Sequence, residues 1–204
     1  MSRYFSYFPQ RLYSLDSGET YQIITDILKR VKFDDTIKNE SVLYYTYSIQ
    51  DGERPEILAH KIYGDEEKHW MILLLNDIVD IKEQWPLSYK ELNDHIISTY
   101  GSIATAQSTV HAYYKTLTYK ILNSDDTVRV EKTQITSTQY AAVVEGTETF
   151  VMSDGTRYTL QTQKTQQSKY DYEIALNDSK REIKVLKKQY VNNVMKNFQD
   201  LINV

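Results

Sequence analysis

The sequence predicts an α+β protein with a strand–helix–helix module, a small antiparallel β region and a long C-terminal amphipathic helix. Three observations predict this order. Residues 44–87 read as a strand, a turn and two short helices. Residues 102–163 are rich in Thr, Val, Tyr and Gln and alternate in polarity, which is typical of strands. Residues 165–203 carry apolar side chains at steps of three and four, which is typical of one helix face.

Residues 1–43 are predicted to form a partly extended N-terminal arm. An aromatic cluster stands near its start, formed by Tyr4, Phe5, Tyr7 and Phe8. This cluster either anchors the arm in the core of its own chain or docks onto another subunit, since terminal arms often order only on a partner. A short helix is predicted over residues 25–31, where apolar residues share one face.

Residues 44–101 are predicted to form the strand–helix–helix module together with a following helix. Tyr44–Ile49 is apolar and aromatic and reads as the strand. Pro55 suits the first turn of the next helix, because its missing N–H would be unpaired there anyway. Gly64 stands where that helix needs a left-handed residue to end, and Asp65 is placed to cap the second helix. A third helix is predicted over residues 88–99, with a capping-box spacing at its start.

Residues 102–163 are predicted to form the antiparallel β region. Turn residues separate its strand-like runs at 123–126 and 153–155. A short helix is predicted within it over Thr136–Val144, because Thr136 or Ser137 could cap a helix there.

Residues 164–204 are predicted to form the C-terminal helix. Its apolar stripe consists of Ile183, Leu186, Tyr190, Val194, Phe198 and Leu201. A long amphipathic helix buries such a face either against its own domain or against a helix of another chain. Tyr190, Val194 and Phe198 are therefore candidate partner-binding residues. The basic stretch Lys180–Lys188 on the same helix is interpreted as its solvated side, with phosphate backbone or an acidic partner as the alternatives.

The composition argues against several classes of protein. The 204 residues suffice for one or two domains. A net charge of −4 gives no general attraction to nucleic acid or to an anionic membrane. No segment approaches the length of about 18 apolar residues that a membrane span needs. The absence of cysteine removes disulfides, thiolate catalysis and cysteine-based zinc sites, and it suits assembly in a reducing cytoplasm.

No catalytic residue, metal site or cofactor site is expected. The four histidines neither show a metalloprotease spacing nor gather in a cluster, and the six glycines form no phosphate-binding loop. Adjacent acidic residues are explained by helix caps and turns. The 18 tyrosines are the one outlier. They are equally well explained by protein interfaces and by strands, both of which are rich in tyrosine.

The central segment DGERPEILAHKIYGDEEKHWMILLLNDIVD resembles the LysM-like segment of the baseplate wedge proteins of contractile-tailed bacteriophages, the gene-53-type family of T4-like phages. The matching features are Arg54-Pro55-Glu56, the Tyr63-Gly64 break, the apolar run that starts at Trp70, and Asn76-Asp77. The exit Trp85-Pro86 and the aromatic start of the chain fit as well. The resemblance implies a LysM-like module whose core includes Leu58, Tyr63, Gly64, Trp70 and Leu74.

The same resemblance implies a structural protein of the virion. A family member binds other wedge subunits and helps to join adjacent wedges into a closed ring around the tail hub, so several copies assemble together. Sheath- or tube-initiating proteins and hub proteins are further expected partners, while nucleic acid and membrane are not. The expected place is the tail baseplate, after assembly in the host cytoplasm. Arg54 and the four aromatic residues of the arm are candidate partner-binding residues.

Two alternatives remain open at this point. Ordinary LysM modules bind N-acetylglucosamine polymers of peptidoglycan or chitin, and the sugar would lie near residues 51–54 and 76–80. That region is charged rather than aromatic and occurs once, whereas weak glycan modules gain useful affinity from repetition. The second alternative is an enzyme such as a muramidase, which would need two carboxylates placed across a cleft.

Overall fold

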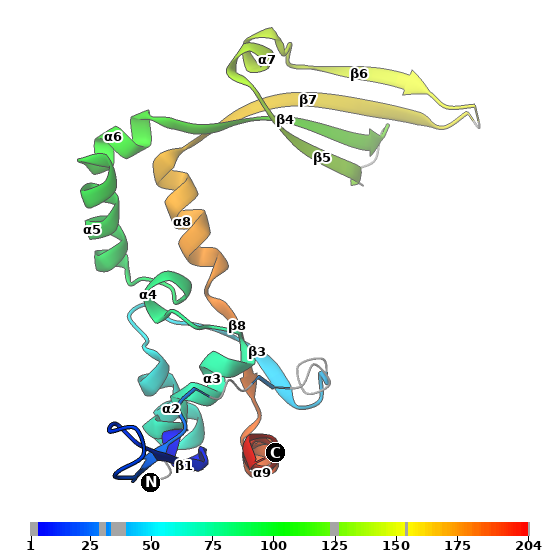
Figure 1. Ribbon diagram of the computed structural model, residues 1–204. Helices are drawn as coiled ribbons and strands as arrows, with labels where there is room; N and C mark the ends of the chain where they lie inside the picture. The colour runs from blue at the N-terminus through cyan, green and yellow to red at the C-terminus, as the bar shows by residue number, and fades with distance from the viewer. Residues whose placement is uncertain (1–3, 29–31, 34–39, 123–126, 154, 204) are drawn as a thin grey trace. The chain divides into compact units, whose positions relative to one another are not determined.

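The computed structural model describes residues 4–28, 32–33, 40–122, 127–153 and 155–203 (Figure 1). Helices and small antiparallel sheets alternate along the chain, which confirms the α+β class. The chain forms two compact units. Unit 1 contains residues 1–89 and 177–204, and unit 2 contains residues 90–176. Unit 1 is therefore built from two segments that are far apart in the sequence.

Unit 1 combines two small sheets with short helices. Its strands are β1 (Gln10–Tyr13), β2 (Gln22–Thr25), β3 (Tyr44–Ser48) and β8 (Glu182–Leu186). Its α-helices are α2 (Pro55–Tyr63), α3 (His69–Leu75), α4 (Ile81–Gln84) and α9 (Val191–Asn203), and its 3-10 helices are η1 (Tyr4–Tyr7), η2 (Glu66–Lys68) and η3 (Lys188–Tyr190). Strand β1 pairs with β2, and β3 pairs with β8, both in antiparallel register.

The helices of the central module begin and end where the sequence predicts. Pro55 occupies the first turn of α2, and Gly64 follows its last residue in the left-handed conformation, with φ 75°. The Gly64 N–H donates to the carbonyl of His60 at 2.8 Å. Asp65 caps the next turn by accepting a hydrogen bond from the Glu67 N–H at 3.1 Å. That turn is the 3-10 helix η2, from which α3 continues.

The prediction of a single helix over residues 165–203 is wrong. Strand β7 runs to Ser168, helix α8 covers Lys169–Ser179, and β8 separates α8 from α9. Ile183 and Leu186, which the prediction placed on a helix face, lie in β8 and are buried. The segment EIKVL is short and rich in β-branched and apolar residues, so it is suited to a buried strand beside β3.

The core of unit 1 gathers side chains from both segments of the unit. Helices α2 and α3 contribute Leu58, Met71 and Ile72, and the C-terminal segment contributes Val185 and Phe198; all are less than 2% exposed. The other buried apolar residues of this core are Phe8, Phe33, Ile49, Ala59, Tyr63, Trp70, Leu75, Trp85, Ile183, Leu186, Val191, Val194 and Ile202. The strand–helix–helix module is thus completed by β8 and α9.

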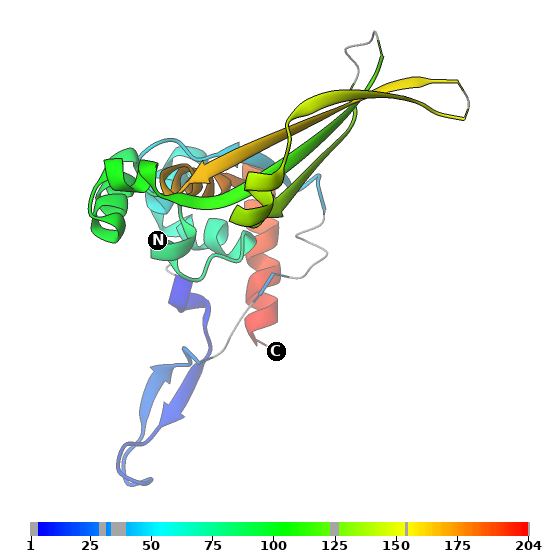
Figure 2. The same ribbon diagram turned by 90° about the horizontal axis from the view of Figure 1, so that it is seen from above.

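The N-terminal arm forms a hairpin rather than the predicted short helix. Strands β1 and β2 pair over four residues each, and residues 26–28 follow as irregular chain and a turn (Figure 2). The rest of the helix predicted over 25–31 lies outside the described residues. Ile24 has the spacing of the predicted helix face, but it is β-branched and therefore also fits the strand β2.

Unit 2 contains a four-stranded antiparallel sheet and several helices. The strand order is β5 (Thr127–Ile135), β4 (Val110–Ile121), β7 (Arg157–Ser168) and β6 (Gly146–Val151). The helices are α5 (Tyr89–Tyr100), α6 (Ile103–Ser108), α7 (Ser137–Ala142) and α8, except that Tyr89 and residues 177–179 of α8 belong to unit 1. The predicted helices at 88–99 and within 136–144 are confirmed as α5 and α7. A capping box between Thr136 and Gln139 starts α7.

Candidate interaction surfaces

Within the described residues, no group of three or more His, Asp or Glu side chains could hold a metal ion. The helices that the structure describes are all too short or too polar to cross a membrane.

The aromatic cluster of the arm packs on the core of its own unit. The Tyr4 ring lies 5.2 Å from the Trp70 ring and 5.0 Å from the Phe8 ring, measured between centroids. Phe8 is buried, and Tyr7 and Tyr4 are half-buried, whereas Phe5 is 55% exposed. In this structure, three of the four candidate partner-binding residues hold the arm against unit 1. Phe5 is the one that presents most of its surface to solvent.

The apolar face of α9 is likewise turned into unit 1. Phe198 is fully buried, with its ring 4.6 Å from that of Trp70, and Val194 is 4% exposed. Tyr190 is half-buried in η3, immediately before α9. The two alternatives for this face were its own domain and another chain, and the structure places it on its own domain. Leu201, at 47% exposure, lies at the margin of the stripe.

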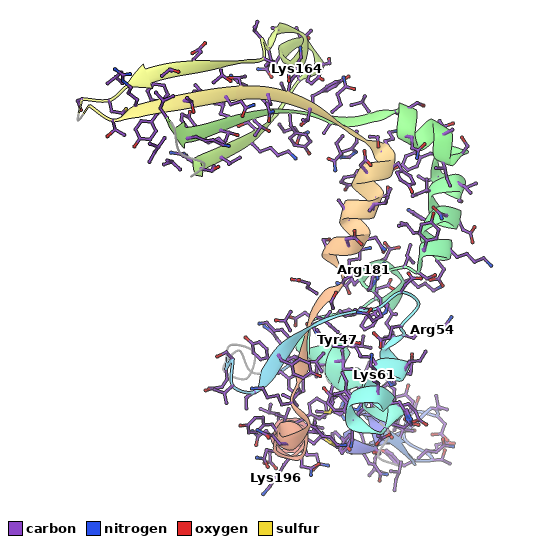
Figure 3. All side chains as sticks on the ribbon, turned by 180° about the vertical axis from the view of Figure 1, so that it is seen from behind. Tyr47, Arg54, Lys61, Lys164, Arg181 and Lys196 are labelled. Atoms are coloured by element: carbon purple, nitrogen blue, oxygen red, sulfur yellow. The ribbon has the colours of Figure 1, made fainter. Side chains whose placement is uncertain are left out.

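Arg54 stands at the N-terminus of α2, beside a polar network (Figure 3). The Tyr47 hydroxyl donates to the Glu53 carboxylate at 2.9 Å. Lys61 Nζ donates to the Tyr47 oxygen at 2.8 Å and to Glu53 at 3.0 Å. Burial disfavours the ionised form of Glu53, but the hydrogen bonds that the carboxylate accepts outweigh burial and lower its pKa. The network fixes the start of α2, next to the exposed Arg54 side chain.

The hairpin β1–β2 exposes the largest set of apolar side chains in unit 1. Leu12 and Ile23 are directly opposite each other and are 64% and 67% exposed. The other exposed members are Tyr13, Leu15, Tyr21, Ile24, Ile27 and Leu28. A two-stranded hairpin is marginally stable alone in water, and so many exposed apolar residues are typical of a contact surface. The sequence interpretation placed Ile24, Ile27 and Leu28 on the face of a predicted helix, and it named none of this set as contact residues.

The hairpin loop is stiffened by a carboxylate. Asp16 accepts hydrogen bonds from the Thr20 hydroxyl at 2.6 Å, the Thr20 N–H at 2.8 Å and the Ser14 hydroxyl at 2.7 Å. These bonds, those of Thr20 first, lower the pKa of Asp16 to about 2. At neutral pH the Asp16 carboxylate is therefore ionised and accepts these hydrogen bonds in the loop between the two strands.

The four-stranded sheet of unit 2 has little core of its own. Among its described strand residues, only Ala112 is buried. Alternation along the paired strands separates an apolar face from a face rich in Thr and Gln. The apolar face carries Tyr113, Leu117, Tyr119, Ile121, Ile135, Phe150, Tyr158 and Leu160.

Helix α7 covers one end of this apolar face. The rings of Tyr113 and Tyr140 lie 4.8 Å apart, and Lys164 Nζ donates to the carbonyl of Val143 at 3.1 Å. Beside the helix, a pocket of about 450 Å³ is lined by residues that include Leu117 and Leu160. A sheet needs a second layer to bury its apolar face, and in unit 2 that layer is supplied only in part by α7.

Comparison with known proteins gives two matches. The sequence matches the family described as base plate wedge protein 53 over residues 8–201. It is also 32% identical, over 90 residues, to the baseplate wedge protein gp53 of Enterobacteria phage T4. This second alignment covers 43% of the chain and 45% of the phage T4 protein, so it spans less than half of that relative's length.

Proposed function

This chain belongs to the base plate wedge protein 53 family, and from that membership we propose that it is a wedge subunit of a contractile phage tail baseplate. The family is one of structural phage baseplate proteins and not of enzymes. The subunit binds other wedge proteins and helps to join adjacent wedges into the ring around the tail hub. Sheath- or tube-initiating proteins and hub proteins are further candidate partners. Its place is the tail baseplate of the virion.

The match to the family over residues 8–201 carries this proposal, because it includes both units rather than the central module alone. The surfaces described above support it. The hairpin β1–β2 exposes apolar side chains, and the apolar face of the β4–β7 sheet leaves most of its side chains only half-buried. A subunit of a large assembly buries such surfaces against its neighbours. Phe5 and Arg54 belong to the same set of candidate contact residues, since neither is buried in unit 1.

A glycan-binding role for a LysM-like module has less support. In the region proposed for a sugar, the Asn76 amide is engaged with the backbone of Lys184, and Asp51 accepts a hydrogen bond from the Tyr89 N–H at 2.9 Å. Trp85 is 5% exposed and its indole N–H donates to the Glu53 carbonyl, so its ring is unavailable for stacking on a sugar. The polar groups of this region serve the fold, which favours a LysM-like module used for protein contacts.

Incorporation into tails tests the proposal. A phage that lacks its own copy of the gene is supplied with the tagged chain, and purified tails are probed for the tag. The proposal expects the chain in tails, and it expects loss from tails when Leu117 and Leu160 are both replaced by Ser. The matched control replaces Thr116 and Thr118, on the opposite face of the same sheet, by Ser.

Two outcomes contradict the proposal. A chain that is absent from purified tails is not a baseplate subunit. Binding of the purified chain to chitooligosaccharide or peptidoglycan, without incorporation into tails, favours the glycan-binding alternative instead.

A further inference from the structure

The outer edge of strand β8 is closed by a side chain. Asn76 Oδ1 accepts a hydrogen bond from the Lys184 N–H, and Asn76 Nδ2 donates to the Lys184 carbonyl, each at 2.8 Å. Both backbone groups of Lys184 therefore point away from β3. In an antiparallel ladder, residues alternate between pairs that bond to each other and pairs whose backbone groups point outward. Lys184 and its opposite residue Thr46 form one of the outward-pointing pairs.

Two backbone hydrogen bonds just beyond the ends of β3 and β8 indicate independently which residues of β3 bond to β8 and which point outward. The Lys187 N–H donates to the Leu43 carbonyl at 2.9 Å, and the Ile49 N–H donates to the Arg181 carbonyl at 2.9 Å. Leu43 and Ile49, which bond to the opposite strand, are each three residues from Thr46. Because bonded and outward-pointing residues alternate along the strand, Thr46 points outward, as do Tyr44 and Ser48. In the part of the chain that the structure describes, the Thr46 N–H and carbonyl have no hydrogen-bond partner.

Among the residues that the structure describes, the edge of β3 also lacks the features that normally protect a sheet edge. Native proteins block exposed edges with Pro, with Lys, with bulges or with a covering element. The strand YYTYS contains neither Pro nor a charged residue, and its register with β8 is regular. Tyr45, Thr46 and Ser48 are exposed. The two edges of this small sheet thus differ within the described residues, since Asn76 closes the edge of β8 at Lys184 and the edge of β3 is open at Thr46.

We propose that β3 accepts an extended segment of another baseplate protein as a third strand of the β3–β8 sheet. This inference rests on the proposed function, which supplies the other chain. The Ser48 carbonyl already accepts a hydrogen bond from Gln50 Nε2 at 2.9 Å, so the open groups are those of Tyr44 and Thr46. The occupant is an extended peptide, because extended backbone offers donors and acceptors at the spacing of these groups.

The two faces of the β3–β8 sheet indicate which side chains the added segment should carry. Tyr45 and Tyr47 point to the side of the sheet that also carries Ile183 and Val185, which are buried in the core. Thr46 points to the opposite side with Lys184. The added strand therefore alternates, with apolar residues beside the tyrosine rings and polar residues beside Thr46.

Replacement of Thr46 by Pro tests the proposal with little effect on the ladder to β8. Proline removes the outward N–H and places its ring in the path of an added strand, and edge positions whose N–H faces solvent tolerate it. The matched control is Thr46→Ala, which shortens the side chain but keeps the N–H. Incorporation into tails is expected to fall at least about tenfold for Thr46→Pro and to be unchanged for Thr46→Ala.

If Thr46→Pro fails to fold, amide hydrogen exchange of the unsubstituted chain tests the added strand instead. The Thr46 amide is expected to exchange rapidly in the free protein, and at least about tenfold more slowly in purified tails. Fast exchange of Thr46 in tails that contain the chain would overturn the added strand and leave the proposed function intact. Absence of the chain from tails would overturn the proposed function, and this inference with it.

Discussion

The side-chain amide of Asn76 pairs with both backbone groups of Lys184, a residue 108 positions later in the chain. The same Nδ2 group also donates to the Ile72 carbonyl at 2.8 Å, at the end of α3. One side chain thus joins the second helix of the central module to the strand that completes it. Without this amide, the edge of β8 and the end of α3 would each lose a hydrogen-bond partner.

Replacement of Asn76 by Ala is expected to destabilise unit 1 by about 2–4 kcal/mol, because three hydrogen bonds are lost and backbone groups are left unpaired. Urea unfolding followed by tryptophan fluorescence measures the change. Asn193→Ala, at an exposed position of α9, is the matched control and should change the free energy of unfolding by less than about 0.5 kcal/mol. Equal effects of the two substitutions would contradict the structural role of Asn76.

Replacement of Phe198 by Ala is expected to cost about 3–5 kcal/mol, since the ring is fully buried against Trp70. The environment of the indole changes at the same time, so the Trp fluorescence of the native state should shift. Leu201→Ala on the same helix is the control, because Leu201 is 47% exposed. A Phe198→Ala variant that unfolds like the unsubstituted chain would show that α9 does not pack into unit 1 in solution.

Replacement of Glu53 by Gln is expected to weaken the network with Tyr47 and Lys61 by about 1–3 kcal/mol at neutral pH. The pKa of Glu53 is lowered in the folded state from its ordinary value of 4.5. The stability that the ionised carboxylate contributes is therefore fully present at a pH above the ordinary pKa of the unfolded state. It is lost as the pH falls through the lower pKa of the folded state.

The difference in unfolding free energy between the unsubstituted chain and Glu53→Gln should accordingly shrink as the pH is lowered to about 3. Denaturant titrations at several pH values measure this difference, and other acidic groups such as Asp16 cancel in the comparison. A difference that stays constant with pH would mean that the carboxylate keeps an ordinary pKa in the folded protein.

Replacement of Leu12 and Ile23 together by Ser is expected to leave the stability of unit 1 unchanged, because both side chains are more than half exposed. Incorporation into tails should fall, since the hairpin then offers no apolar contact on that face. Gln10→Ser on the same face is the control, because it exchanges one polar residue for another. Normal incorporation of the double variant would remove the hairpin from the set of contact surfaces.

Local signals in the sequence predicted the short elements of the structure. Pro55, Gly64 and Asp65 mark the start and end of α2 and the cap of η2 through backbone chemistry that acts within a few residues. The helix at 137–142 was predicted for the same reason, from the capping ability of Thr136. The alternation of residues 102–163 predicted the antiparallel sheet, although strand β7 continues to Ser168.

Long-range pairing explains what the sequence could not predict. Ile183 and Leu186 fit the spacing of the α9 stripe, and only the contact of β8 with β3 shows that they lie in a strand. The candidate residues of the arm and of α9 share an apolar or aromatic character. Because Tyr4, Phe8, Val194 and Phe198 come from opposite ends of the chain, their packing on one core was not visible in either segment alone.

The hydrogen bonds of Asn177 bear on how the segment inserted in unit 1 can change in length during evolution. Its side chain accepts from the Leu87 N–H at 2.7 Å and donates to the Leu87 carbonyl at 3.0 Å, so the points where the chain leaves and re-enters unit 1 are tied together. Everything between them is an insertion with neighbouring ends. Such an insertion can be lengthened, shortened or exchanged during evolution while the β3–β8 sheet of unit 1 keeps its register.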